Sequence, residues 1–96
     1  MPSSSEVLAL LREQRGALAE LGVQRIGLFG SVARDEAGPD SDVDLLVEID
    51  EHTFDRYMDL KIFLEDLLGR TVDLVLADRL KPRLRERILA EVIDAA

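Results

Sequence analysis

The chain has 96 residues, no cysteine, 47% hydrophobic residues and a formal net charge of −8. These features exclude disulfides and thiolate metal sites, and they disfavour nonspecific binding to nucleic acid, which needs an excess of lysine and arginine. The apolar runs are too short to span a bilayer and the first residues lack the regions of a signal peptide, so we expect a cytoplasmic protein that binds no membrane. We also expect a single domain over residues 1–96.

The first half of the chain predicts a helix, a strand and a short helical turn. Hydroxyl and acidic residues at 3–6 are typical of a helix start, apolar residues then recur at helical spacing, and Gly22 is placed to end one continuous helix. Residues 25–29 form a short, mostly apolar strand. We expect one helical turn capped by Ser31 to follow, before a Gly-Pro-Asp sequence at 38–40 breaks the chain.

The second half predicts two strands, each followed by a helix. Residues 42–49 and 71–76 are the strands, and residues 54–68 between them form a helix with a broad apolar face that includes Phe54. Thr53 is placed to cap the start of this helix, and Gly69 is placed to end it. The final helix begins at or just after Asp78.

The connections between these elements predict how the strands pair. The long helical crossover permits parallel pairing of the second and third strands, whereas the short first connection suits an antiparallel or irregular pairing. We therefore predict an α+β fold of two layers, in which a mixed three-stranded sheet packs with about four helices. We expect the apolar faces of the first and last helices to belong to the core.

Aspartates interrupt two of the predicted strands. Asp42 and Asp44 are one residue apart and so share one face of the second strand, and Asp73 interrupts the apolar third strand. A solvated polar face could explain the first pair, and a partly exposed edge position could explain Asp73. The Gly30-Ser31 turn just before them favours a site instead, because it offers a close backbone approach, a hydroxyl and an N–H to a phosphate. Paired carboxylates are the ligands that Mg²⁺ prefers.

These residues carry a resemblance to a known family. Gly30-Ser31 and Asp42-Val43-Asp44, with ten residues between them, match the signature of the DNA polymerase β-like nucleotidyltransferase superfamily. The sequences at 29–34 and 41–47 most closely resemble the minimal nucleotidyltransferases, the antitoxin half of the HEPN/MNT toxin–antitoxin systems. The resemblance implies a nucleotidyltransferase fold and a Mg²⁺-dependent transfer of AMP from ATP to a tyrosine of a HEPN ribonuclease toxin, which would be the partner.

The resemblance also implies a role for each motif residue. Gly30 and Ser31 are expected to hold the triphosphate. Asp42 and Asp44 are expected to bind both of two Mg²⁺ ions, and Asp73 to bind the catalytic ion and act as general base. Two further positions are expected to contact the nucleotide or to hold the motif loop: Arg34 and Ser41.

Two other functions stay open at this point. The chain could be an antitoxin that neutralises its partner by occlusion, without catalysis, or a subunit that adenylylates a small molecule such as an aminoglycoside. The intact carboxylate triad favours catalysis, and the lack of room for a substrate-binding domain disfavours the small molecule. The basic residues between Arg79 and Arg87 are interpreted as a solvated helix face or a contact for an acidic partner. The only histidine, His52, is given no catalytic role.

Overall fold

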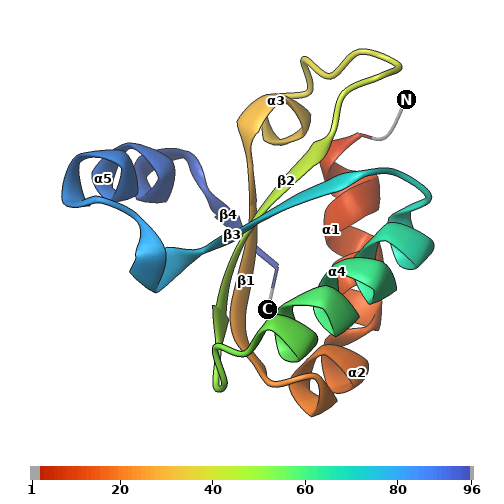
Figure 1. Cartoon of the computed structure of the whole chain (residues 1–96). Helices are drawn as coiled ribbons and strands as arrows, with labels where there is room; N and C mark the ends of the chain where they lie inside the picture. Colours follow the sequence, from red (N-terminus) through yellow and green to blue (C-terminus); the bar gives the residue numbers. More distant parts are fainter. Residues whose placement is uncertain (1–2, 96) are drawn as a thin grey trace.

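A mixed four-stranded sheet in the order β3-β2-β1-β4 organises the computed structural model, which describes residues 3–95 (Figure 1). Its strands are Val23–Phe29 (β1), Val43–Ile49 (β2), Val72–Leu76 (β3) and Ile93–Asp94 (β4). β1 is antiparallel to both β2 and β4, while β2 and β3 are parallel. The predicted α+β class, the mixed sheet and the parallel pairing across the helical crossover are therefore confirmed. The short strand β4 is an addition to the three predicted strands.

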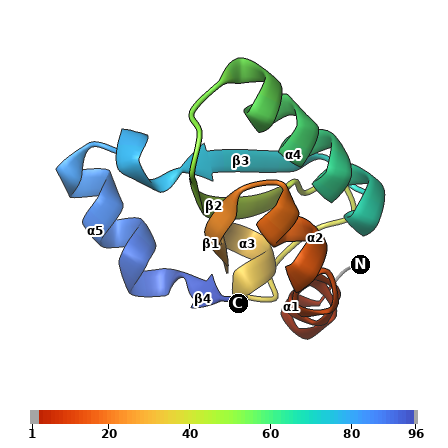
Figure 2. The ribbon, with the colours of Figure 1, turned by 90° about the horizontal axis from the view of Figure 1, so that it is seen from below.

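The helices lie on both sides of this sheet. They are Ser4–Glu13 (α1), Arg15–Glu20 (α2), Gly30–Ala33 (α3), Phe54–Leu68 (α4) and Pro82–Glu91 (α5), and a 3₁₀ turn covers Ala77–Arg79. Figure 1 shows α1, α2 and α4 gathered on one side, with α5 projecting on the other. Figure 2, seen at right angles, shows α5 standing clear of those three helices. Within residues 3–95 no helix is both long enough and apolar enough to cross a membrane.

The hydrophobic core lies between the sheet and the helices α1, α2 and α4. Successive strand residues point to opposite faces of a sheet, so alternate apolar residues of β1, β2 and β3 share the face toward these helices. Leu45 on β2 is fully buried and pairs with Leu28 on β1 and Leu74 on β3. From α1, α2 and α4 the core receives six buried side chains: Val7, Leu8, Leu11, Leu18, Leu60 and Leu64. The opposite face of the sheet carries Asp44 and Asp73 as well as the buried Leu46.

The predicted N-terminal helix is two helices. The chain leaves helical geometry at Gln14, where φ is −98° and ψ is 19°. The break separates α1 from α2, and both helices then contribute buried residues to the core. Gly22 ends α2 as predicted, with a φ of +87° that a side chain would disfavour. Its carbonyl accepts a hydrogen bond from the Asp50 N–H at 2.9 Å, which ties this turn to the end of β2.

Two predictions around the motif loop are wrong by one residue. The helical turn α3 begins at Gly30, with Phe29 at the N-cap position, so Ser31 lies inside the turn and does not cap it. β2 begins at Val43, so Asp42 lies in the loop just before the strand and not on it. Asp42 therefore lies outside the regular strand pleat that the prediction assumes for the pair Asp42 and Asp44.

Helix α4 has the predicted bounds, but not all of the predicted apolar face is buried. Thr53 caps it by accepting a hydrogen bond from the Arg56 N–H, and Gly69 ends it with a φ of +65°. Phe54 is 77% exposed, contrary to prediction. At 3.6 residues per turn it lies roughly 80–120° around the helix from the buried pair Leu60 and Leu64, outside their stripe.

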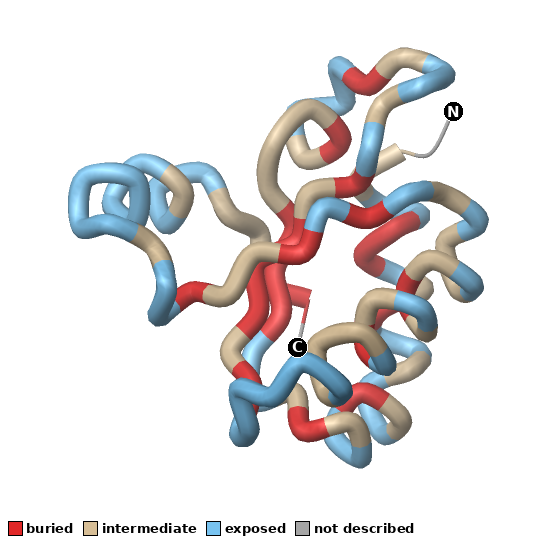
Figure 3. The backbone as a smooth tube through the Cα atoms, in the orientation of Figure 1, coloured by how far each residue is buried: buried red, intermediate tan, exposed pale blue. Residues whose placement is uncertain are grey.

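The prediction that the last helix contributes to the core is also wrong. Figure 3 shows no buried residue in α5. Leu84 and Leu89 are 47% and 43% exposed. The chain instead returns to the sheet as β4, which pairs with β1, so that α5 meets the sheet only near its C-terminal end. There Val92 lies over Gly27, where a Cβ atom would come within 3.2 Å of the Ile93 carbonyl oxygen.

Candidate active site

Asp44 and Asp73 are brought together by the register of two parallel strands. They are direct partners on β2 and β3, so their Cα atoms are separated by about one strand spacing, ~4.8 Å. Their neighbours Val43 and Val72 point into the core. The two carboxylates therefore lie side by side on the opposite face of the sheet, away from α1 and α4. Asp73 is exposed and β3 is an edge strand, so the edge position considered from the sequence is also its actual position.

Gly30 places the turn after β1 directly against Asp44. Phe29, the last residue of β1, pairs with Asp44, and the chain turns at the next residue, where φ is +77°. A Cβ atom at Gly30 would lie 2.9 Å from Cγ and 3.1 Å from Cβ of Asp44, and closer still to its carboxylate oxygen. Any side chain here would push Asp44 away. The glycine is thus needed both for its backbone conformation and for the close approach.

The carboxylate of Asp44 is electrostatically strained in this position. Its pKa is raised to about 6, first by partial burial and further by the negative charge of Asp73, a hydrogen bond with Asp73 and the charge of Asp42. The charge of Arg34 partly opposes them. The three predicted carboxylates therefore interact, and the strongest carboxylate neighbour of Asp44 is Asp73.

Asp42 and Ser41 belong to the loop before β2, which several hydrogen bonds hold in place. Ser41 Oγ accepts a hydrogen bond from the Gly38 N–H at 2.9 Å. Arg70 Nη1 donates to the carbonyl oxygens of Pro39 and Ser41 at 3.1 and 3.4 Å. Ser41, Asp42 and Arg70 also line one polar hollow at this end of the sheet. The structure thus gives the Ser41 hydroxyl a role in fixing the loop, and it adds Arg70, which no pattern in the sequence indicates.

A divalent cation fits the chemistry of the carboxylates, although their arrangement is incomplete. Over residues 3–95 no group of three or more histidine, cysteine, aspartate or glutamate side chains is arranged to hold a metal ion. The pair Asp44 and Asp73 supplies neighbouring oxygen ligands, and the raised pKa of Asp44 marks a site where a cation would relieve repulsion. Asp42 lines the polar hollow with Ser41 and Arg70 and would have to come closer to this pair to complete the predicted set.

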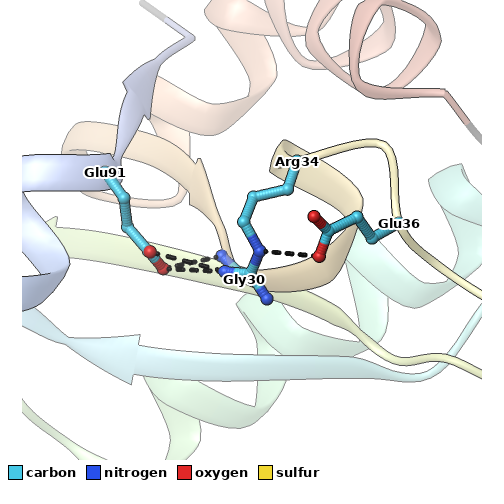
Figure 4. Close-up of polar contacts among 4 residues, drawn as sticks. All are labelled: Gly30, Arg34, Glu36 and Glu91. Atoms are coloured by element: carbon cyan, nitrogen blue, oxygen red, sulfur yellow. Dashed lines mark hydrogen bonds and ion pairs between the residues drawn. The ribbon is translucent and has the colours of Figure 1, made fainter.

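Arg34 sits between two glutamates beside the Gly30 turn (Figure 4). Its Nε donates to Glu36 at 3.1 Å and its Nη1 pairs with Glu91 Oε2 at 3.4 Å. The hydrogen bond to Glu36 and the charge of Glu91 raise the pKa of Arg34. Glu91 Oε1 also accepts a hydrogen bond from the Gly30 N–H at 3.2 Å. No signal in the sequence connects Glu91 with this turn, because 60 residues lie between it and Gly30 and only the return of α5 to the sheet brings it there.

The raised pKa of Asp44 predicts how stability changes with pH. Between about pH 4 and pH 6 the folded protein holds a proton that the unfolded chain releases, so the free energy of unfolding falls as pH rises through this window. We expect Asp44→Asn to remove this loss. Without divalent metal at pH 7.5 the variant should be more stable than the wild type, by on the order of 1 kcal/mol after allowance for solvent screening.

Urea unfolding at several pH values, in EDTA, tests this expectation. The advantage of Asp44→Asn should shrink toward zero near pH 4, where the wild-type carboxyl is already protonated. Asp59→Asn, a change of the same charge on the exposed surface of α4, is the control and should show no such trend. A stability difference that stays constant across this range would contradict the assignment of the raised pKa to Asp44.

Comparisons with known proteins match this geometry. The family described as "Nucleotidyltransferase domain" matches residues 11–95. The protein adenylyltransferase MntA of Thermococcus cleftensis is 40% identical over 95 residues, which cover 97% of this chain and 96% of that protein. A solved structure described as a minimal nucleotidyltransferase is 48% identical, with a TM-score of 0.75, over 90% of this chain and 93% of that one.

A more distant likeness concerns the fold alone. In the solved complex of a tri-AMPylated HEPN toxin of Shewanella oneidensis with an MNT antitoxin, the matched chain is 20% identical with a TM-score of 0.66. The match covers 93% of this chain and 71% of that one. The region matched by the family model, by contrast, includes the Gly30-Ser31 turn and the aspartates of β2 and β3. The chain therefore belongs to the nucleotidyltransferase domain family, with the fold of a minimal nucleotidyltransferase.

Proposed function

We propose that this chain is a Mg²⁺-dependent protein adenylyltransferase that acts as an antitoxin, transferring AMP from ATP to a tyrosine hydroxyl of a HEPN-family toxin. The observation that carries this proposal is that Asp44 lies against Gly30 and is paired with Asp73 on the neighbouring strand. The relative from Thermococcus cleftensis, named a protein adenylyltransferase, supports transfer to a protein. The adenylylated HEPN toxin of the Shewanella complex supports the choice of partner.

The residues of this chain divide into two groups in the proposed reaction. The backbone N–H of Gly30, the hydroxyl of Ser31 and the guanidinium of Arg34 would bind and orient the triphosphate, with Ser41 holding the loop in front of the site. Asp44, Asp73 and Asp42 would hold Mg²⁺. When bound, the metal would neutralise charge on the phosphates and lower the pKa of the attacking hydroxyl.

The proposed transfer forms one bond and breaks another. The tyrosine oxygen attacks the α-phosphorus of ATP, and the bond from this phosphorus to the oxygen that bridges it to the β-phosphate breaks, so that pyrophosphate leaves. The proton of the tyrosine passes to the carboxylate of Asp73, which acts as general base. Orientation of the acceptor and the nucleotide by a fixed site supplies a large part of the rate acceleration.

Transfer of radioactive label tests the proposal. We expect a HEPN-family protein from the same source to become labelled when it is incubated with this chain, Mg²⁺ and ATP labelled at the α-phosphate. ATP labelled at the γ-phosphate should give no label, because that phosphate leaves within pyrophosphate, and EDTA should prevent transfer. Replacement of acceptor tyrosines by phenylalanine identifies the residue modified. A tight complex of the two proteins without transfer of label would favour neutralisation by occlusion instead.

A further inference from the structure

Glu91, the last residue of α5, binds the same groups of the turn that the proposed function assigns to phosphate. Its Oε1 accepts a hydrogen bond from the Gly30 N–H at 3.2 Å and lies 3.5 Å from Arg34 Nη1. Its Oε2 lies 3.4 Å from the same nitrogen. Figure 4 shows the carboxylate of Glu91 directed at both groups, on the opposite side of Arg34 from Glu36. One carboxylate thus bridges a backbone amide and a guanidinium, as a phosphate would.

This contact is one that a stronger anion can replace. The side chains of Arg34 and Glu91 are 47% and 40% exposed, and ion pairs with that exposure to water are weak. Arg34 keeps its shorter hydrogen bond to Glu36, at 3.1 Å, when Glu91 leaves. Glu91 is also carried by a helix in which no residue is buried, so the packing that opposes its movement is mainly the contact of the neighbouring Val92 with Gly27.

We propose that Glu91 is an internal anionic ligand that occupies the phosphate-binding groups of the nucleotide-free protein and is displaced by the triphosphate. This inference rests on the proposed function, since it takes Gly30 and Arg34 as the phosphate-binding groups. Glu91 therefore competes with the nucleotide and lowers its apparent affinity. Its displacement frees the C-terminal end of α5 from the turn.

Strand β4 and Ala95 stay in place during this exchange. β4 pairs with β1, Asp94 forms an ion pair with Arg25 at 3.3 Å, and the Ala95 N–H donates to the Ile26 carbonyl oxygen at 2.9 Å. These contacts do not involve Glu91. Binding of nucleotide thus loosens α5 between two fixed ends, the 3₁₀ turn at Ala77–Arg79 and β4. The exposed residues Leu84 and Leu89 of α5 move with it.

Calorimetric titration with Mg²⁺ and α,β-methylene-ATP tests the competition, because this analogue cannot be cleaved at the bond that the reaction breaks. We expect Glu91→Ala to bind it roughly three- to tenfold more tightly than the wild type. This range corresponds to a wild type in which Glu91 occupies the Gly30 N–H and the Arg34 guanidinium in roughly 70–90% of molecules. Glu91→Gln, which keeps an oxygen for the Gly30 N–H but loses the charge facing Arg34, should be intermediate. Glu86→Ala makes the same charge change elsewhere on α5 and should bind as the wild type does.

Hydrogen exchange provides a second readout that does not depend on affinity. In the wild type, the analogue should increase amide exchange in α5 while the turn at Gly30 stays protected. In Glu91→Ala, α5 should already exchange fast without the analogue and change little when it is added. Melting curves of all variants show whether each is folded. If Glu91→Ala is not folded, Glu91→Gln is used as the test variant.

The possible failures are distinguishable. Equal affinity in the wild type, Glu91→Ala and Glu91→Gln, with unchanged exchange in α5, would overturn the role of Glu91 alone. An absence of analogue binding in every variant would overturn the nucleotide site, and this inference with it. Binding of the analogue without transfer of label to any toxin would contradict the proposed function but leave the competition by Glu91 standing.

Discussion

Asp73→Asn is expected to lower the transfer of AMP by about 10²- to 10⁴-fold, the range typical for loss of a positioned general acid or base. The proposed reaction takes both a metal ligand and the base from this carboxylate, while the amide of asparagine offers one neutral oxygen. The fold should survive, because Asp73 is exposed on an edge strand. The variant also loses the negative charge that raises the pKa of Asp44. Activity should therefore fall without loss of stability.

Initial rates of label transfer, with each variant shown to be folded by its melting curve, measure this effect. Asp59→Asn is again the matched control and should transfer AMP at the wild-type rate. Asp44→Asn should be at least as inactive as Asp73→Asn, since it replaces the proposed metal-binding carboxylate beside Gly30 by a neutral amide. Near-normal transfer by Asp73→Asn would mean that Asp73 is an ordinary exposed residue of an edge strand, the alternative that the sequence leaves open.

Gly30→Ala is expected to be the most damaging small substitution in the site. It forces a Cβ atom onto a residue with a φ of +77° and drives that atom into the Asp44 side chain. A non-glycine residue in the left-handed region costs about 1–2 kcal/mol of stability by itself, and the collision adds to this. Displacement of Asp44 should also suppress AMP transfer. Urea unfolding and label transfer measure the two effects.

Gly69→Ala separates the two contributions to the stability loss of Gly30→Ala, namely the backbone conformation and the collision with Asp44. Gly69 has a similar φ of +65°, but a Cβ atom there would meet nothing within 4 Å. Its stability loss therefore measures the backbone term alone, and the excess loss in Gly30→Ala measures the collision. In a background of Asp44→Ala that excess should shrink, because the carboxylate is gone. If Gly30→Ala and Gly69→Ala lose the same stability in the wild-type background, the collision with Asp44 contributes nothing to the change in the free energy of unfolding.

The sequence predicts the parts of this protein that depend on local pattern. Helix α4 begins and ends where predicted, because a capping threonine and a terminal glycine act on their own neighbours. The parallel pairing of β2 and β3 follows from the length of the crossover between them. The motif residues Gly30, Asp44 and Asp73 are recognisable by their types and spacing. Their roles as triphosphate and metal ligands stay predictions.

The tertiary structure alone decides the features that depend on distant segments. Strand β4 is too short to stand out as a pattern and forms only because β1 has a free edge for it. For the same reason, the amphipathic pattern of α5 predicts burial although the helix stands off the sheet with no buried residue. Glu91 reaches Gly30 and Arg34 only through that arrangement. Periodicity identifies which face of a helix is apolar, but whether another part of the chain covers that face is a matter of long-range packing.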